Sequence, residues 1–179
     1  MSDILSPPLL AAIGKRRIDF WAEDGRAKYG DCDPFAMLPL VRGKDVLEIG
    51  PGEGRQRKLL APVAGSYTAC DICVRKDTWL MKHGYATDFG HLYDLVFFWC
   101  VLHHVLADER LGFAWFVLRH LKPGGFLWFN APEKGDTDDG IGDGIGTTGH
   151  PHEAVLGMFP CCELLSRSPD GSYLMRRGA

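Results

Sequence analysis

The sequence has neither an excess of basic residues nor a long apolar segment. Its 179 residues include 20 Lys and Arg against 23 Asp and Glu, a formal net charge of −3. Nonspecific binding to phosphate backbones requires a basic face, so we expect no nucleic-acid partner. No stretch reaches the roughly 18 apolar residues of a membrane-spanning helix, and the first residues lack the basic start and apolar run of a signal peptide. We therefore expect a soluble, cytoplasmic protein with no membrane partner.

Internal repeats and a disulfide framework are also absent from the sequence. The six cysteines lie mostly in apolar runs, as reduced core thiols do. The segment Cys70-Asp-Ile-Cys73 has the spacing of a metal-binding pair, but no second pair follows, so we predict no metal site. At roughly 150 residues per domain, the length predicts a single domain.

Strand and helix patterns alternate from Asp45 to Asn130. The run Leu95-Val-Phe-Phe-Trp99 is apolar without alternation, as expected for a central parallel strand covered on both faces. This order predicts an α/β fold with a doubly wound, mainly parallel sheet and right-handed crossovers. The predicted strands are 46–49, 66–70, 85–87, 95–99 and 126–129, and the predicted helices are 54–63, 74–82 and 108–121.

The segments outside this core have different patterns. Residues 6–29 predict one or two helices. Residues 133–149 are rich in Asp, Gly and Thr and form a long loop, which is either a lid or disordered. A short helix over 152–158 and an antiparallel hairpin formed by 161–165 and 172–175 are expected to follow.

A glycine-rich turn follows the first predicted strand, in Asp45-Val-Leu-Glu-Ile-Gly-Pro-Gly-Glu-Gly-Arg55. Glycines let the backbone approach a ligand that would collide with a Cβ atom. A dinucleotide site requires G-x-G-x-x-G, but here Arg55 stands where the last glycine should be. Glu48, two residues before the first glycine, would repel a pyrophosphate and suits a cationic amino group instead.

Two further acids follow the second and third predicted strands. Asp71 lies 23 positions after Glu48, at a strand end where a carboxylate accepts hydrogen bonds from two ribose hydroxyls. Asp88 and Phe89 follow the predicted third strand. We expect Asp88 to hold an adenine amine and Phe89 to cover the ring.

Taken together, these motifs resemble those of the class I S-adenosylmethionine-dependent methyltransferases. The resemblance spans residues 46–130 and also rests on Asp94-Leu-Val-Phe-Phe-Trp-Cys-Val-Leu-His-His104 and Leu121-Lys-Pro-Gly-Gly125. It implies a seven-stranded sheet with an antiparallel C-terminal hairpin. It also implies S-adenosylmethionine as methyl donor and S-adenosylhomocysteine as product. By this resemblance the cofactor-binding residues are Glu48, Gly50, Pro51, Gly52, Asp71, Ile72, Asp88, Phe89, Trp99 and Cys100.

The same resemblance divides the chain into functional segments. Residues 1–44 would form an N-terminal helical lid and residues 45–130 the cofactor-binding core. Residues 131–150 would form a flexible loop, and residues 151–179 the short helix and closing hairpin. Tyr29 in the lid and His150 at the end of the loop are the residues we expect to contact the substrate, although His150 would also fit the start of a helix.

His103 and His104 are the candidate catalytic residues. A hydroxyl acceptor needs a base to take its proton, and a neutral imidazole suits this near pH 7. The segment resembles that of small-molecule and sugar O-methyltransferases, which place a base here. We favour His104, while packing beneath the next helix remains the alternative for either residue. Cys100 is expected to be a core thiol rather than a nucleophile.

The prediction is methyl transfer from S-adenosylmethionine to a small polar acceptor, namely an oxygen of a sugar, glycan or secondary metabolite. Protein or RNA methylation is an alternative, and so is a catalytically inactive, cofactor-binding interaction module. The chain has little inserted sequence from which to build an acceptor pocket, so the pocket could be completed by a second subunit in a homodimer.

Overall fold

The computed structural model describes residues 34–73, 79–80, 85, 87–106, 108–131, 133, 149–169 and 171–179. The predicted N-terminal helices and the substrate candidate Tyr29 lie outside these residues. Most of the predicted loop over 133–149 also lies outside them.

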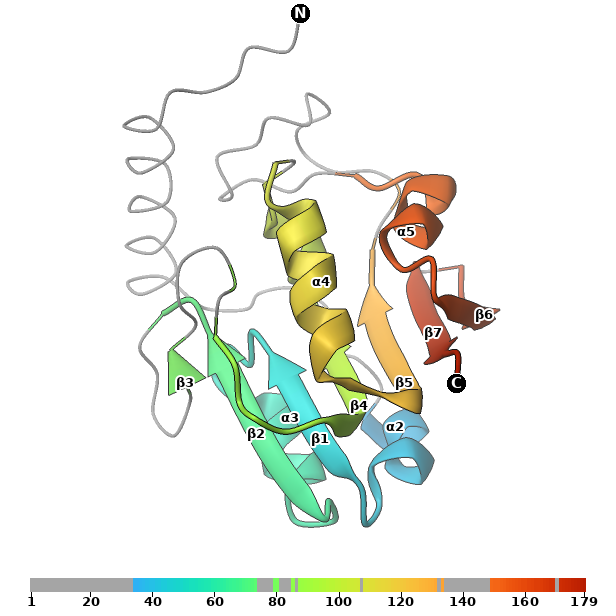
Figure 1. The fold of residues 1–179 in the computed structure, drawn as a ribbon. Coiled ribbons are helices and arrows are strands. Elements are labelled where there is room, and N and C mark those ends of the chain that lie inside the picture. Colours follow the sequence, from blue (N-terminus) through green and yellow to red (C-terminus); the bar gives the residue numbers. More distant parts are fainter. Residues whose placement is uncertain are drawn as a thin grey trace, which may run out of the picture.

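A mixed β-sheet forms the centre of the molecule (Figure 1). Its strands lie in the order β3-β2-β1-β4-β5-β7-β6. Neighbouring strands are parallel from β3 to β5, and β7 and β6 add an antiparallel hairpin. The predicted doubly wound sheet with a closing hairpin is therefore confirmed. The strands are β1 (Asp45–Ile49), β2 (Ser66–Asp71), β3 (Trp79–Leu80), β4 (Tyr93–Phe98), β5 (Leu121–Asn130), β6 (Cys162–Arg167) and β7 (Ser172–Arg177).

Helices cover both faces of this sheet (Figure 1). On one face, α2 (Pro34–Val41) and α3 (Arg55–Leu60) pack with Val46 of β1. On the other, α4 (Arg110–His120) and α5 (His152–Met158) share a core with Leu47 and Ile49. Because successive side chains of a strand point to opposite faces, a strand covered on both sides is apolar throughout. No helix in the described part of the chain is long and apolar enough to cross a membrane.

Two local predictions were wrong. The predicted helix over 74–82 contains β3, which pairs with Cys70 and Asp71 at the end of β2. The predicted strand over 85–87 does not form, because Tyr85 has a φ of 59°, a left-handed conformation incompatible with a strand. Its ring instead packs edge-on against Phe113 of α4, with ring centroids 5.4 Å apart.

α2 lies within residues 1–44, which were expected to form a helical segment, but the sequence pattern predicted helices only over 6–29. Pro34 is the first residue of α2. At that position the missing N–H of proline would be unpaired in any case, so proline starts a helix as readily as it ends one.

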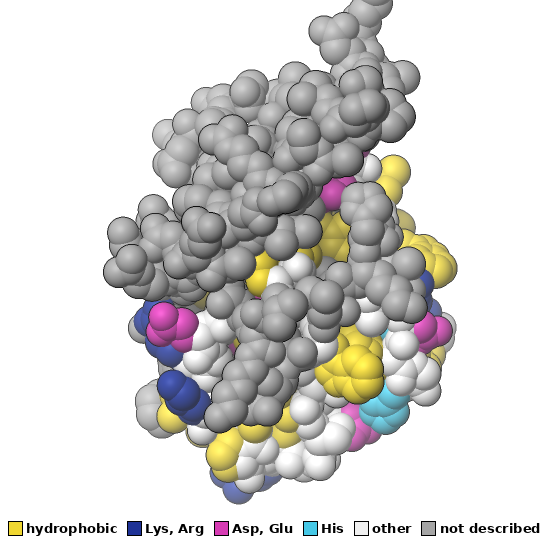
Figure 2. Space-filling view, turned by 90° about the vertical axis from the view of Figure 1, so that its left-hand side faces the viewer, with side chains coloured by type: hydrophobic (Ala, Val, Ile, Leu, Met, Phe, Trp, Pro, Cys, Tyr) yellow, Lys and Arg dark blue, Asp and Glu magenta, His cyan; other side chains and the backbone are white. Residues whose placement is uncertain are grey.

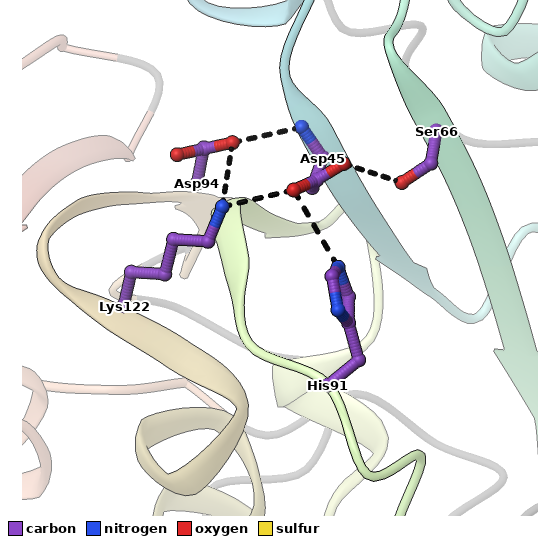
Figure 3. A network of polar contacts seen from close by, with 5 residues as sticks. All are labelled: Asp45, Ser66, His91, Asp94 and Lys122. Atoms are coloured by element: carbon purple, nitrogen blue, oxygen red, sulfur yellow. Dashed lines mark hydrogen bonds and ion pairs between the residues drawn. The ribbon is translucent and has the colours of Figure 1, made fainter.

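A polar network joins the amino ends of the strands (Figure 3). The Lys122 ammonium donates to Asp45 Oδ2 at 2.9 Å and lies 3.1 Å from Asp94 Oδ2. Asp94 Oδ2 also accepts the Asp45 N–H, and the Ser66 hydroxyl donates to Asp45 Oδ1. The hydrogen bond from Lys122 lowers the pKa of Asp45. These contacts tie β1, β2, β4 and β5 together at the edge opposite the glycine turn.

The edge of the sheet at β3 has a mixed surface. Trp79 of β3 is largely exposed, and its ring lies edge-on to Phe89 with centroids 5.9 Å apart. Figure 2 views the molecule from this side, where hydrophobic, basic and acidic side chains share the described part of the surface.

Candidate active site at the carboxyl edge of the sheet

The glycine turn after β1 is built from three left-handed residues. Gly50, Gly52 and Gly54 have φ values of 68°, 54° and 71°. The Gly50 N–H donates to the carbonyl of Cys70 at 2.8 Å, which ties the turn to β2. A Cβ atom at Gly50 would lie 2.5 Å from Cγ2 of Val101, in the segment after β4. The turn is therefore fixed between the carboxyl ends of β2 and β4, and only glycine fits at its first position.

Glu48 lies buried beside this turn. Its side chain is 2% exposed, and the Tyr67 hydroxyl donates to its Oε2 at 2.8 Å. Burial raises the pKa of Glu48 to about 7, against the opposing effects of the Tyr67 hydrogen bond and the Arg57 charge. A cationic group next to Glu48 would favour its carboxylate form and so bind more tightly as the pH rises.

Asp71 ends β2 on the same side of the sheet as Glu48. It is 6% exposed, and its Oδ1 accepts the N–H of Cys73 at 3.1 Å, which fixes the orientation of the carboxylate. The negative charge of Asp71 contributes to the raised pKa of Glu48, so the two acids lie within electrostatic range. Ile72, between Asp71 and Cys73, packs against the core under α4.

The carboxyl end of β4 is shaped by a side chain from β5. Cys100 has a φ of 55°, and its N–H donates to Asn130 Oδ1 at 2.6 Å. The Asn130 amide in turn lies 3.6 Å from the Cys100 sulfur. Trp99 packs edge-on against Trp128 of β5, with centroids 6.0 Å apart. Sequence reasoning missed this role of Asn130; the available signal was a polar residue ending an apolar strand.

The histidine pair forms the last two residues of a short 3₁₀ helix, η2 (Leu102–His104). His103 is 5% exposed, and burial together with the neighbouring imidazoles lowers its pKa to about 3. His104 is half-buried, and the two rings lie 4.2 Å apart between centroids. His150 joins them, because its buried Nε2 lies 3.2 Å from the Leu102 carbonyl oxygen. The structure therefore brings the substrate candidate His150 to η2, which carries both base candidates.

Asp88 and Phe89 lie in the segment that precedes β4. Phe89 packs on Tyr93, the first residue of β4, and on His120, the last residue of α4. The side chain of Asp88 is 74% exposed and lies 3.6 Å from His120 Nε2. The ring of Phe89 also lies edge-on to Trp79 of β3, which pairs with Cys70, and the adenine-binding role of Asp88 and Phe89 stays a prediction.

A family model described as a methyltransferase domain matches residues 21–156, most of the chain. The chain belongs to this methyltransferase family. The predicted class, a class I S-adenosylmethionine-dependent methyltransferase, is thereby confirmed. A search of curated proteins found no match to this methyltransferase.

Solved structures share the fold of this methyltransferase at low sequence identity. One is the 1,6-didemethyltoxoflavin-N1-methyltransferase of Burkholderia thailandensis, with bound 1,6-didemethyltoxoflavin and S-adenosylhomocysteine (17% identity, TM-score 0.67, covering 100% of this chain and 93% of that one). The second is the N-methyltransferase NodS of Bradyrhizobium japonicum WM9, in complex with S-adenosylhomocysteine (16% identity, TM-score 0.62, covering 92% of this chain and 96% of that one). The third is the sugar N-methyltransferase KedS8 of Streptoalloteichus sp ATCC 53650 (15% identity, TM-score 0.63, covering 87% of this chain and 90% of that one).

Replacing Gly50 by alanine should destabilise the methyltransferase more than the same change at Gly43. Both glycines have a φ of 68°, but a Cβ at Gly43 has no atom within 4 Å. Gly43→Ala should cost the left-handed strain alone, about 1–2 kcal/mol. Gly50→Ala adds the collision with Val101, about 1–3 kcal/mol more. Urea denaturation of both variants measures the difference, and equal losses would contradict the close packing at Gly50.

Replacing Glu48 by glutamine should raise stability at alkaline pH. Folding raises this pKa from 4.5 to about 7, so the folded protein holds the proton more tightly and stability falls as pH rises across that interval. Above pH 7 the buried carboxylate lowers the free energy of unfolding by its full cost, about 3 kcal/mol. Glu48→Gln should remove most of this cost at pH 8 and none of it at pH 4.

Unfolding free energies measured by denaturant titration between these pH values test this directly. Tyr67→Phe is the matched control: it removes the hydrogen bond that favours the carboxylate and should extend the falling interval to higher pH. An identical pH dependence in the wild type and in Glu48→Gln would refute the buried-acid assignment.

Proposed function

We propose that this methyltransferase binds S-adenosylmethionine across the carboxyl ends of β1, β2 and β4 and methylates a small polar acceptor. The observation that carries this proposal is the pair of buried acids, Glu48 and Asp71, beside a left-handed glycine turn. A buried acid with a raised pKa is costly to the fold, and such groups cluster at functional sites.

The residues at this edge fit the cofactor in charge and shape. The backbone of Gly50 and Gly52 would line its methionine portion, where side chains would obstruct it. Glu48 would pair with its ammonium group, and Asp71 would accept hydrogen bonds from its ribose hydroxyls. Pro51, Ile72, Trp99 and Cys100 would complete the walls. When bound, S-adenosylmethionine supplies an electrophilic methyl group on a cationic sulfur.

His104 is the proposed base for the acceptor. It is more accessible than His103, which lies closer to the protein interior. For a hydroxyl acceptor, His104 would take the O–H proton as the oxygen attacks the methyl carbon and the sulfur leaves. His103 and His150 would hold the acceptor beside it. Orientation by the site supplies much of the rate in such an in-line displacement.

The acceptor atom has two candidates. The histidine pair favours a hydroxyl oxygen of a sugar, glycan or secondary metabolite, since such a group needs a base. The names of the three solved structures favour a nitrogen on a sugar or another small molecule. A neutral amine already carries a lone pair and depends less on a base.

Asp71→Ala should weaken binding of S-adenosylhomocysteine by about 10–100-fold, the value of hydrogen bonds to a charged group. Calorimetric titration of the purified protein measures this. Asp71→Asn is the matched control, because its amide oxygen still accepts the Cys73 N–H and keeps the turn intact. It should retain wild-type stability and bind with intermediate affinity. If Asp71→Ala binds S-adenosylhomocysteine with unchanged affinity, Asp71 does not bind the ribose. If the folded wild type does not bind S-adenosylhomocysteine, the proposed cofactor site is wrong.

His104→Ala separates the two acceptor atoms. With a hydroxyl acceptor found by screening methyl transfer to hydroxylated and aminated sugars, kcat should fall by about 10²–10⁴ at every pH. With an amine acceptor, activity should recover once the pH exceeds the acceptor's own pKa. Affinity for S-adenosylhomocysteine should stay unchanged in both cases. Full activity of His104→Ala on a hydroxyl acceptor would exclude it as the base.

A further inference from the structure

Four nitrogen-bearing side chains gather above the carboxyl end of β4. His103 and His104 come from η2, Arg110 is the first residue of α4, and His150 precedes α5. His103 and His104 have their rings in contact, and His150 Nε2 lies against the Leu102 carbonyl. Burial lowers the pKa values of His150 and His103; the Arg110 charge lowers that of His150 further, and the His104 and His150 charges that of His103. Elements distant in sequence thus bring four cationic or potentially cationic groups together.

Several polar atoms of this cluster are buried without a hydrogen bond. Nδ1 of His103 and both Nε and Nη2 of Arg110 are inaccessible to solvent and bond to no other residue that the structure describes. Burying a polar group without a partner costs about 1–3 kcal/mol, and more for a charged one. In native proteins such groups mark places where a ligand or an ordered water supplies the missing bond.

Among the described residues, no carboxylate forms an ion pair with Arg110, His103 or His150. Burial alone accounts for the lowered pKa of Arg110, with no acid acting on it. The acid next in sequence, Glu109, faces Tyr85, whose hydroxyl lies 3.5 Å from its Oε2. Lys122 and Arg167 have acidic partners, namely Asp45 with Asp94 and Glu133. Arg119 and Arg177 donate to backbone carbonyls.

We propose that His103, His150 and Arg110 bind an oxyanion carried by the methyl acceptor, a carboxylate or a phosphoryl group. The guanidinium presents Nε and Nη2 side by side, the fork that grips two oxygens of one oxyanion. The His103 Nδ1 supplies a further donor. This inference rests on the proposed function, because the oxyanion would anchor the acceptor beside the proposed base His104. The rings of His103 and His104 have centroids 4.2 Å apart.

An oxyanion bound here would also change the protonation of the cluster. Its charge would favour the imidazolium forms of His103 and His150, which burial now suppresses. Binding of the anion should therefore be accompanied by proton uptake below neutral pH.

The test uses inorganic phosphate and acetate as probes on the full chain. Histidine imidazole resonances, followed by NMR during titration, should shift on adding phosphate, and calorimetry should give its affinity. Arg110→Gln should weaken phosphate binding at least about tenfold, the usual value of a charge-assisted bidentate contact. Its thermal stability should be unchanged or higher, because the variant removes two buried guanidinium nitrogens that lack a hydrogen bond. Comparison of phosphate with acetate tells which oxyanion the site prefers.

Arg176→Gln is the control of equal net charge. Arg176 is exposed on the C-terminal hairpin, where its Nε donates to the Gly124 carbonyl, and its loss should leave phosphate affinity unchanged. Absence of binding of both probes overturns the inference, as does equal binding by wild type and Arg110→Gln. Calorimetry with S-adenosylhomocysteine on the same samples separates the two proposals. If the wild type binds S-adenosylhomocysteine but neither probe, the oxyanion site alone fails; if it does not bind S-adenosylhomocysteine, the proposed function fails.

Discussion

The left-handed turn at Gly50 is the constraint on which the rest of the site depends. Its N–H bonds to Cys70 at the end of β2, and its α-carbon lies too close to Val101 to carry a side chain. Glu48 precedes this turn and Asp71 follows Cys70, so one glycine fixes both acids relative to the segment after β4. The Lys122 network holds the opposite ends of the same strands, so their register is set at both edges of the sheet.

The site and the core of the molecule follow opposite physical rules. In the core, apolar side chains are fully buried, and peripheral charges such as Lys122 have partners. At the carboxyl edge, Glu48 is buried although burial disfavours its charged form, and His103 Nδ1 and Arg110 Nε and Nη2 are buried and unbonded. These groups weaken the isolated fold. A fold keeps such groups when a ligand supplies the missing partner, so the least satisfied part of the protein is where binding is expected.

Local periodicity was enough to predict most of the fold. The alternation around β1 and β2, the unbroken apolar run of β4 and the helix His152–Met158 were all read from the sequence, since each depends on residues close in the chain. The failures came where local signals compete. The two-residue strand β3 exists only because the end of β2 offers it a partner.

Site residues divide in the same way. The positions of Glu48, Gly50 and Asp71 follow from strand ends that a parallel sheet brings to one edge, and this was predictable. Asp88 was expected there from its place after a third strand; that strand does not form, and the Asp88 carboxylate lies 3.6 Å from His120 Nε2. The contact between His150 and η2 joins segments 48 positions apart, and no sequence spacing encodes it. The unbonded atoms of Arg110 become visible only once its surroundings are known.

The charges at the carboxyl edge fall into two groups on either side of β4. Glu48 and Asp71 lie on the side of β1 and β2, and the histidines with Arg110 lie on the side of α4 and α5. A cationic methyl donor and an anionic acceptor would each be attracted to the group of opposite charge. The Cys100 turn, held by Asn130, lies between the two groups, so both reactants would meet there. In the proposed reaction with a hydroxyl acceptor, methyl transfer would neutralise the sulfonium while the acceptor's proton moves to a histidine. Separating charges in a buried site is costly. In this reaction the positive charge would move only a short distance, from the sulfonium to a histidine that the fold already holds in position.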